Sequence, residues 1–106
     1  MPENFALDRD NVFESLKIPP NSIQAEQSVL GGLMLDNLTW DSVADKIDEH
    51  DFYRKDHRLI FRTIAKLAEE QVPFDVITIS ETLEATGELD TVGGLSYLGM
   101  LAKDTP

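Results

Sequence analysis

The sequence predicts an all-α domain, a compact bundle of about five to six short helices. Apolar residues recur at helical spacing along most of the chain after residue 20. Residues that can cap a helix precede several of these stretches, and short polar connections separate them. No internal repeat or low-complexity tract interrupts the pattern, so a single helical domain is the simplest interpretation.

The 106 residues are enough for one domain with one modest core. Residues 1–20 are predicted to form a flexible N-terminal tail, in which Val12, Phe13 and Leu16 could form one short amphipathic turn. Pro19-Pro20 stops any helix, because a proline pushes the residue before it toward extended structure. The helical domain is therefore expected to cover residues 21–106.

The first helix is expected to begin at Asn21 or Ser22, because Asn21 and Gln24 are spaced as in a capping box. Gly31-Gly32 within it is costly for a helix, and we interpret the pair as close packing against a neighbouring backbone. The apolar stripe of this helix consists of Ile23, Val29, Leu30, Leu33 and Met34. A second helix is expected over residues 39–48, with Thr39 as its cap, and the longest over residues 54–71.

The fourth helix is the ambiguous one, because residues 76–79 are all β-branched and propensity alone would favour a strand. Asp75 is a good cap, Thr78 and Glu81 are spaced as in a capping box, and Gly87 suits the position after a helix. We therefore predict a helix. A fifth helix follows Gly93-Gly94 and carries Leu95, Leu98, Leu101 and Ala102.

Twenty acidic residues against nine basic ones give a net charge of −11. Proteins that grip DNA neutralise its phosphates with Lys and Arg, so direct DNA binding is not expected. Anionic membrane surfaces are disfavoured for the same reason, and basic or apolar protein surfaces are favoured. The absence of cysteine is compatible with the cytoplasm, where we expect the chain to act. No stretch is apolar enough to cross a bilayer, and the N-terminus lacks the features of a secretory signal.

Motifs for chemistry are sparse. A P-loop needs a glycine directly before a lysine, and no glycine here precedes one, so no nucleotide site of that kind is expected. His50-Asp51 matches the dipeptide of metal-dependent phosphohydrolases, which need a further histidine upstream, whereas His57 lies downstream. We interpret both histidines as surface or half-buried residues and predict no catalytic, cofactor or metal-binding residue.

Two charged patches are candidates for partner binding. Four acidic residues of the second predicted helix could dock a basic partner, although a solvated helix face is the commoner outcome; they are Asp41, Asp45, Asp48 and Glu49. Arg54, Arg58 and Arg62 recur every four residues with Lys66 and form a basic stripe. It could contact nucleic acid or an acidic partner, but flanking acids and the lack of an interleaved aromatic favour charge balance within the domain.

Leu95, Tyr97 and Leu98 are the apolar candidates for a protein interface. Three such close neighbours on a helix cannot all face the core, and Tyr97 falls off the stripe of Leu95, Leu98 and Leu101. An amphipathic aromatic near the surface is a typical interface anchor, although a half-exposed tyrosine lying on its own domain is at least as common.

An extended series of short motifs resembles the opening of the DnaB-type replicative DNA helicases. The series runs in order from Ile18 to Pro106, and its pieces together are far more specific than any one alone. They are residues 18–23 (IPPNSI), 25–32 (AEQSVLGG), 51–53 (DFY), 57–58 with 60–61 (HR, IF), Asp75, 77–78 (IT), Leu83, 87 with 89–90 (G, LD), 92–94 (VGG), 97–98 (YL), Leu101 and 105–106 (TP).

The resemblance implies an all-helical domain that forms a collar on a six-membered ring, often as a trimer of dimers. In that family a helical hairpin and a RecA-like ATPase follow, and the parent protein unwinds DNA with ATP and Mg²⁺. Expected partners are the other helicase subunits, the C-terminal domain of primase, and a helicase loader or phage protein. This sequence stops before the hairpin and the ATPase, so we expect a mainly monomeric chain.

Three alternatives stay open on sequence alone. The helicase-binding C-terminal domain of primase resembles this fold, although Met1 argues against it because that domain ends a longer chain. A free-standing acidic adaptor or inhibitor would use the negative charge directly. A small metal-dependent hydrolase would need His50, Asp51 and His57 to bind a metal, and metal-insensitive thermal stability would exclude it.

The purified chain is expected to show no ATP hydrolysis and no DNA unwinding, because it lacks a P-loop. A coupled phosphate-release assay and a forked-duplex unwinding assay would measure both activities. ATP turnover above background by the pure chain would contradict this prediction.

Overall fold

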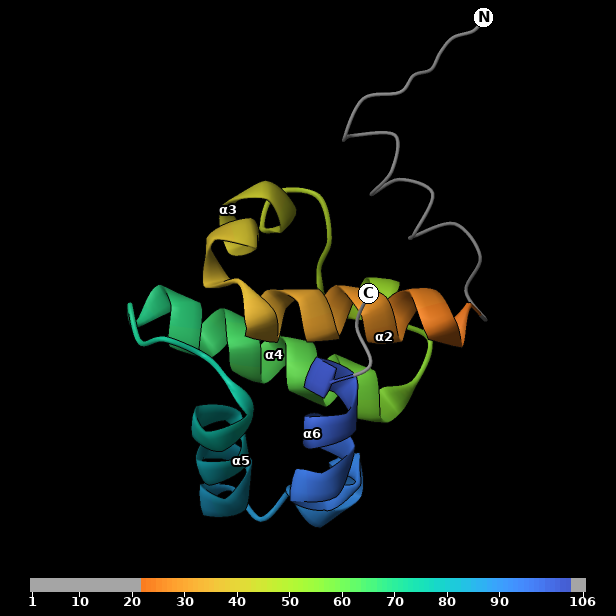
Figure 1. Cartoon of the computed structure of the whole chain (residues 1–106), viewed down its shortest axis with the longest axis vertical. Coiled ribbons are helices and arrows are strands. Elements are labelled where there is room, and N and C mark those ends of the chain that lie inside the picture. The colour runs from red at the N-terminus through yellow and green to blue at the C-terminus, as the bar shows by residue number, and fades with distance from the viewer. Residues whose placement is uncertain (1–21, 104–106) are drawn as a thin grey trace, which may run out of the picture.

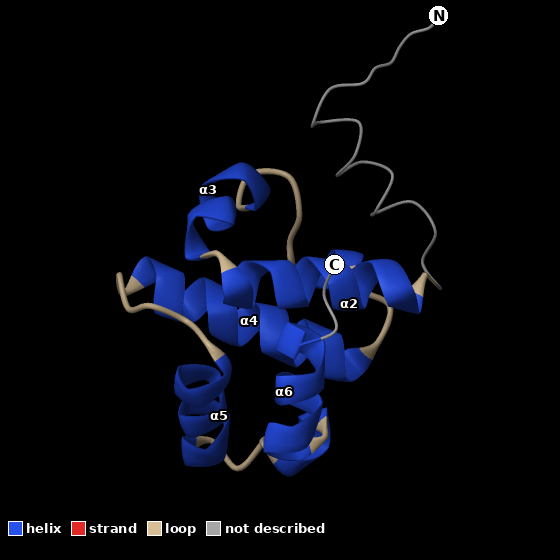
Figure 2. Cartoon of the chain, in the orientation of Figure 1, coloured by secondary structure: helices blue, strands red, loops and turns tan. Residues whose placement is uncertain are grey.

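A computed structural model describes residues 22–103 of the chain. Within this range the chain forms helices joined by turns and short loops, with no strand (Figure 2). The all-α prediction is confirmed. The predicted tail over residues 1–20, the Asn21 cap and the last matching motif at residues 105–106 lie outside the described residues.

Two longer helices, α2 (Ile23–Leu35) and α4 (Lys55–Glu69), run alongside each other through the middle of the domain (Figure 1). The short α3 (Trp40–Val43) lies on one side of them, preceded by the 3-10 turn η2 (Asn37–Thr39) and followed by η3 (Glu49–Asp51). On the other side α5 (Val76–Ala85) and α6 (Gly94–Lys103) pack against each other, with η4 (Asp90–Val92) between them in the chain. No described helix is long and apolar enough to cross a membrane.

One hydrophobic core joins these helices. Each of the four longer helices buries a pair of aliphatic side chains three or four residues apart, which is the spacing of one helix face. The pairs are Leu30 and Leu33, Ile60 and Ile64, Ile79 and Leu83, and Leu98 and Leu101. Because each such burial is worth about 1.5–3 kcal/mol relative to exposure, the shared core holds together helices that would be marginal alone.

Helix α2 follows its prediction with two differences. Ser22 occupies the N-cap position but makes no side-chain hydrogen bond there. Gly31 is buried, whereas a Cβ at Gly32 would meet nothing within 4 Å, so close backbone packing at Gly32 was the wrong interpretation. The buried face of α2 also contains Glu26, a charged side chain placed one helical turn before Leu30.

The second predicted helix is much shorter than expected. It ends at Val43, and Thr39 makes no side-chain cap bond. Aspartate side chains form local turns instead: Asp36 accepts from the Leu38 amide at 3.1 Å, and Asp48 accepts from the His50 amide at 2.8 Å. Such side-chain bonds compete with a continuous helix, which is why the aspartate-rich stretch forms two turns around a single helical turn.

Helices α4 and α5 end in the same way, with a residue of positive φ after the last turn. Gly87 has φ 78°, and the Glu88 amide donates to the Leu83 carbonyl at 2.8 Å. The corresponding residue after α4 is Gln71, with φ 61°, and the Val72 amide donates to the Leu67 carbonyl at 2.9 Å. Both are Schellman motifs, but only glycine adopts this conformation without a Cβ clash.

Asp75 caps α5 as predicted, but through a different capping box. Its carboxylate accepts from the Thr78 amide and the Thr78 hydroxyl accepts from the Asp75 amide, both at 2.9 Å. The Thr78–Glu81 pairing expected from sequence was therefore wrong, since Thr78 is the third residue of the helix and not its cap. The helix forms despite its β-branched first turn, because both of its ends are capped.

The side chain of Asn37 ties two distant segments together. Its amide nitrogen donates to the Leu33 carbonyl at 3.0 Å and to the Phe74 carbonyl at 2.8 Å. Its oxygen accepts from the Phe74 amide at 2.9 Å. The turn after α2 is thereby fixed to the loop that enters α5.

The two helix ends give a matched test. Gly87→Ala is expected to destabilise the domain by about 1 kcal/mol, because alanine resists positive φ. Gln71→Gly is expected to stabilise it or leave it unchanged, because it relieves the same conflict after α4. Urea denaturation followed by circular dichroism would measure both, and a Gly87→Ala variant as stable as the parent would contradict the argument.

Candidate functional site

A buried polar network joins α2, α4 and α6 at their crossing. His57, in the first turn of α4, has no exposed surface, and its Nδ1 lies 2.7 Å from Oε1 of Glu26 on α2. Its Nε2 lies 2.6 Å from the hydroxyl of Tyr97 on α6, with the two rings nearly parallel, at 10°. The Gln27 amide donates to the same hydroxyl at 3.1 Å. Three helices therefore meet on polar side chains as well as on the apolar core.

One arrangement of protons satisfies every member of the network. A Glu26 carboxylate can only accept, so His57 donates to it from Nδ1. The other ring nitrogen then accepts from the Tyr97 hydroxyl, whose oxygen accepts from the Gln27 amide. Because buried polar groups are costly only when left unpaired, this chain of donors and acceptors makes the polar junction compatible with the core.

Glu26 also organises the start of α4. Its Oε2 accepts from the Tyr53 amide, and its Oε1 lies 3.4 Å from the Arg54 amide, the N-cap residue of that helix. A carboxylate near a helix N-terminus is favoured by the unpaired amides and by the helix dipole. One buried acid thus holds both His57 and the loop that leads into its helix.

The outer side of the network is covered by Arg54. Its guanidinium carbon lies 5.5 Å from the centre of the Tyr97 ring, a cation–π contact. Its Nε donates to Asp56 at 3.0 Å, and this hydrogen-bonded pair raises the pKa of Arg54. Arg54 is about a third exposed, so this edge of the network lies at the surface.

The three apolar interface candidates of α6 differ in how deeply the structure buries them. Tyr97 is partly buried, as expected for a tyrosine whose ring lies on its own domain, and its hydroxyl is held by His57 and Gln27. Leu95 was placed on the buried stripe and is 49% exposed, which corrects that prediction. Leu98 is fully buried, so it can only support an interface from beneath. Gly93 and Gly94 both have positive φ, and the turn they form sets where α6 begins and therefore which of its side chains face the core.

The basic stripe of α4 is largely used inside the domain. Arg58 donates to the backbone carbonyls of Phe52 and Tyr53, at 2.8 and 2.9 Å. Arg62 grips Glu49 with two nitrogens, at 2.7 to 3.1 Å. This pair lowers the pKa of Glu49 and raises that of Arg62 through the hydrogen bonds between them.

The predicted acidic face is only partly a solvated helix face. Asp41 and Asp45 are exposed, whereas Asp48 caps a turn and Glu49 pairs with Arg62. His50 is exposed, but His57 is fully buried and was wrongly expected at or near the surface. Among residues 22–103, no three His, Cys, Asp or Glu side chains are placed to hold a metal ion.

The comparisons with known proteins assign the family. The model of the "DnaB-like helicase N terminal domain" family matches residues 18–106. The chain belongs to the DnaB-like helicase N-terminal domain family. This membership confirms the resemblance that the series of short motifs indicated.

Relatives of this DnaB-like domain agree. The chain is 55% identical over 96 residues to the replicative DNA helicase DnaB of Buchnera aphidicola subsp. Acyrthosiphon pisum, covering 91% of this chain and 21% of that protein. It is 44% identical over 97 residues to DnaB of Haemophilus influenzae, covering 92% and 21%. The chain therefore spans about a fifth of the length of the helicases it matches.

A solved structure supports the fold of the DnaB-like domain. The crystal structure of the N-terminal domain of DnaB helicase from Mycobacterium tuberculosis superposes with a TM-score of 0.79 at 35% sequence identity. The match covers 83% of this chain and 64% of that one.

Sequence reasoning about this DnaB-like domain missed Glu26, Gln27 and the role of His57. A signal for two of them was present. Glu26 lies at helical spacing with Leu30 and Leu33, and His57 with Ile60 and Ile64, so each polar residue falls on a buried apolar face. A titratable residue on such a face predicts a buried partner, although the identity of that partner depends on how the helices cross.

Tyr97→Phe is expected to lower the free energy of unfolding of the DnaB-like domain by about 1–3 kcal/mol, because it leaves a buried acceptor on His57 without its donor. Tyr53→Phe removes the same hydroxyl from an exposed tyrosine and is the matched control. Equal stability of both variants in thermal and urea unfolding would show that the Tyr97 hydroxyl contributes nothing to the network.

Proposed function

We propose that this chain is the scaffold and protein-docking domain of a hexameric, ATP-dependent replicative DNA helicase. In this proposal it shapes the collar of the ring and recruits primase and a loader or phage protein during DNA replication in the cytoplasm. Membership of the DnaB-like family carries the proposal. ATP and Mg²⁺ are assigned to a motor domain outside this chain, and no direct DNA contact is assigned to it.

The start of α6 is the surface that suits docking best. Leu95 is half exposed in the first turn of α6, two residues before Tyr97. The polar network braces Tyr97 against α2 and α4, so this part of α6 is held in one position. A pre-ordered apolar side chain loses little entropy on binding, which favours affinity.

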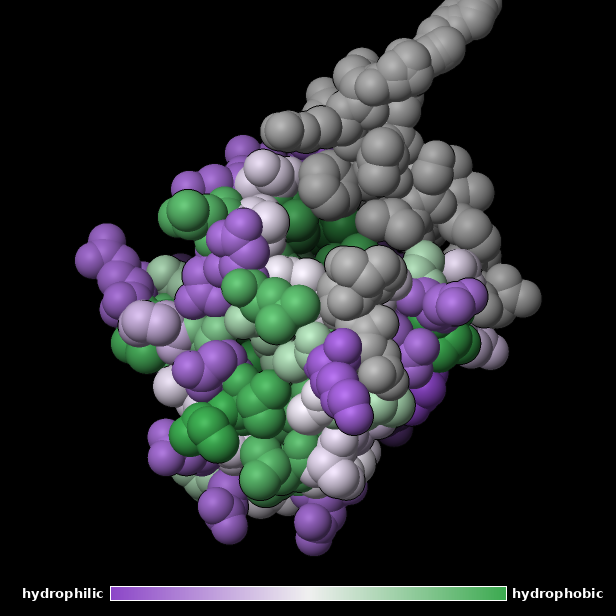
Figure 3. All heavy atoms as spheres, in the orientation of Figure 1, coloured by the Kyte–Doolittle hydropathy of each residue, from purple (hydrophilic) through white to green (hydrophobic). Residues whose placement is uncertain are grey.

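Hydrophobic side chains also gather on the face shown in Figure 3, with hydrophilic residues around its edge. The large apolar side chains exposed in residues 22–103 are Leu35, Leu38, Tyr53, Val72, Ile77 and Leu95. A domain that contacts neighbouring subunits and other replication proteins needs more than one such surface. The surrounding acids would mainly affect the rate and selectivity of these contacts.

The basic residues of α4 and its N-cap already make contacts within the domain. Arg54, Arg58 and Arg62 each already contact other residues of the domain, so a partner would compete with an existing contact to use them. Arg54 is the best placed of the three, because its guanidinium lies over the Tyr97 ring and its side chain is about a third exposed. We therefore propose Leu95 and Arg54 as the principal contacts, with Tyr97 and Leu98 supporting them.

Leu95→Ser is expected to weaken binding of the primase C-terminal domain about tenfold, equivalent to about 1.4 kcal/mol, if Leu95 is an anchor. Surface plasmon resonance on the immobilised chain would measure the affinity, with thermal unfolding as the folding check. Tyr97→Ala is a poorer probe, because it would also break the buried network.

Leu38→Ser is the matched control, since Leu38 is 81% exposed but lies in η2, away from α6 in the chain. Its affinity should match that of the parent. Unchanged binding by a folded Leu95→Ser variant would remove the start of α6 from the docking surface. Failure of the parent chain itself to bind would count against primase recruitment by this domain.

A further inference from the structure

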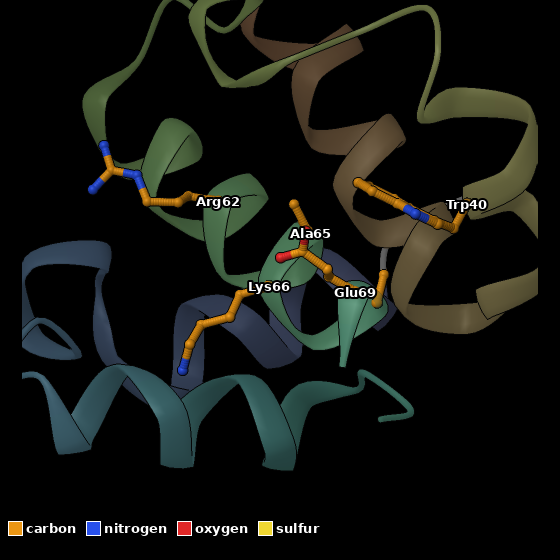
Figure 4. Close-up of a pocket in the computed structure, with 6 residues that line it drawn as sticks. Trp40, Arg62, Ala65, Lys66 and Glu69 are labelled. Atoms are coloured by element: carbon orange, nitrogen blue, oxygen red, sulfur yellow. The ribbon is translucent and has the colours of Figure 1, made fainter. Parts of the chain in front are cut away.

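An open groove of about 520 Å³ lies between α4 and the start of α3. Trp40 forms one wall, and Ala65, Ala68, Arg62, Lys66 and Glu69 of α4 line the rest (Figure 4). The two alanines leave room beside the indole, because a methyl group fills so little space. Trp40 itself is braced by Phe61 and Phe74, at centroid distances of 5.4 and 6.3 Å. The groove therefore has a fixed aromatic wall and an apolar floor.

Two cationic side chains, Arg62 and Lys66, and one acidic side chain, Glu69, line this groove in an otherwise acidic domain. Between Leu67 and Ala102 the sequence has seven acidic residues and no basic one. Lys66 is 3.8 Å from Glu70, and both side chains are more than half exposed, so that pair is weak and can be exchanged. Arg62 is held by Glu49 through Nε and one terminal nitrogen, and the other terminal nitrogen is left for an additional acceptor. The groove suits an apolar side chain flanked by carboxylates.

The sequence before α2 contains that combination. Residues 10–16 read DNVFESL, with Phe13 between Asp10 and Glu14. These two acids are four residues apart, as are Arg62 and Lys66. The remaining apolar residues, Val12 and Leu16, could contact the alanine floor. No other part of the chain outside residues 22–103 places an aromatic directly beside an acid and three residues from another.

The connection is long enough for this segment to reach the groove. Nine peptide units separate Phe13 from Ser22, and they span at most about 30 Å when extended. Helix α2 is about 20 Å long, from its thirteen residues, and the groove lies near the end of α2 where α3 begins. A contact within one chain is therefore geometrically allowed.

We propose that residues 10–16 bind this groove of their own chain, with Phe13 against Trp40 and the carboxylates of Asp10 and Glu14 toward Arg62 and Lys66. Bound there, the segment shields the apolar side chains that line the groove from solvent. This contact is separate from the docking surface at the start of α6 and does not depend on primase binding.

Trp40 is the only tryptophan of the chain, so its fluorescence reports directly on the groove. Phe13→Ala in the whole chain is expected to shift the emission to longer wavelength and to raise the acrylamide quenching constant. Phe5→Ala is the matched control, because it removes a phenylalanine that also precedes α2 but lies outside residues 10–16. Far-UV circular dichroism should be unchanged in both. Identical emission and quenching in the parent and Phe13→Ala would overturn the proposal.

A charge exchange tests the assigned orientation. Glu14→Lys is expected to reproduce the change caused by Phe13→Ala, and adding Lys66→Glu to Glu14→Lys should restore the emission of the parent. Lys55→Glu makes the same charge change at the other end of α4, so adding it to Glu14→Lys should not restore the emission of the parent. Failure of Lys66→Glu to restore the signal would overturn the ionic pairing. A parent signal that depends on protein concentration would assign the segment to a second copy and overturn the contact within one chain.

Discussion

The fold depends on a buried carboxylate that must be fully paired. Glu26 lies on the inner face of α2, where a charge without partners would be strongly destabilising. Its oxygens are engaged by His57 and by the amides that begin α4, and His57 in turn engages Tyr97 on α6. The apolar core would tolerate small shifts of one helix along another. The hydrogen bonds would not, because their geometry is narrow. The polar junction therefore fixes how α2, α4 and α6 cross, and through α6 it fixes where Leu95 is displayed.

Most of the fold was predictable because local rules agree with one another. The limits of α4 and the capped ends of α5 follow from apolar spacing, Asp75 and Gly87, all of which act within a few residues. The predicted second helix failed because aspartate side chains formed turns with the nearby backbone, a local competition that apolar spacing does not reveal. The candidate site was harder to predict. Whether Leu95 or Tyr97 faces the solvent depends on the turn through Gly93-Gly94 and on Glu26 and His57, which lie 71 and 40 residues from Tyr97.

The roles of the charged residues were also only partly predictable from the sequence. A stripe of arginines reads in the sequence as one surface, but each member holds a different neighbour in the fold. The region from Leu67 to Ala102 contains seven acidic residues and no basic one, whereas basic and acidic residues are mixed between Ser22 and Lys66. The sequence shows no aromatic interleaved with the basic stripe, but the fold brings Trp40, fourteen residues before Arg54 in the chain, beside Arg62 and Lys66.

The Asn37 side chain makes the same pair of hydrogen bonds to Phe74 that a neighbouring strand would make, across 37 residues of sequence. Closing so long a loop costs entropy that the enclosed chain must offset by folding. The turn after α2, the whole of α4 and the entry to α5 are thus enclosed in one loop held by a single amide. In hydrogen-exchange terms, the Phe74 amide belongs to the same cooperative unit as the turn that holds Asn37, although α4 separates them in the chain. The entry to α5 can open only when the hydrogen bonds between Asn37 and Phe74 break.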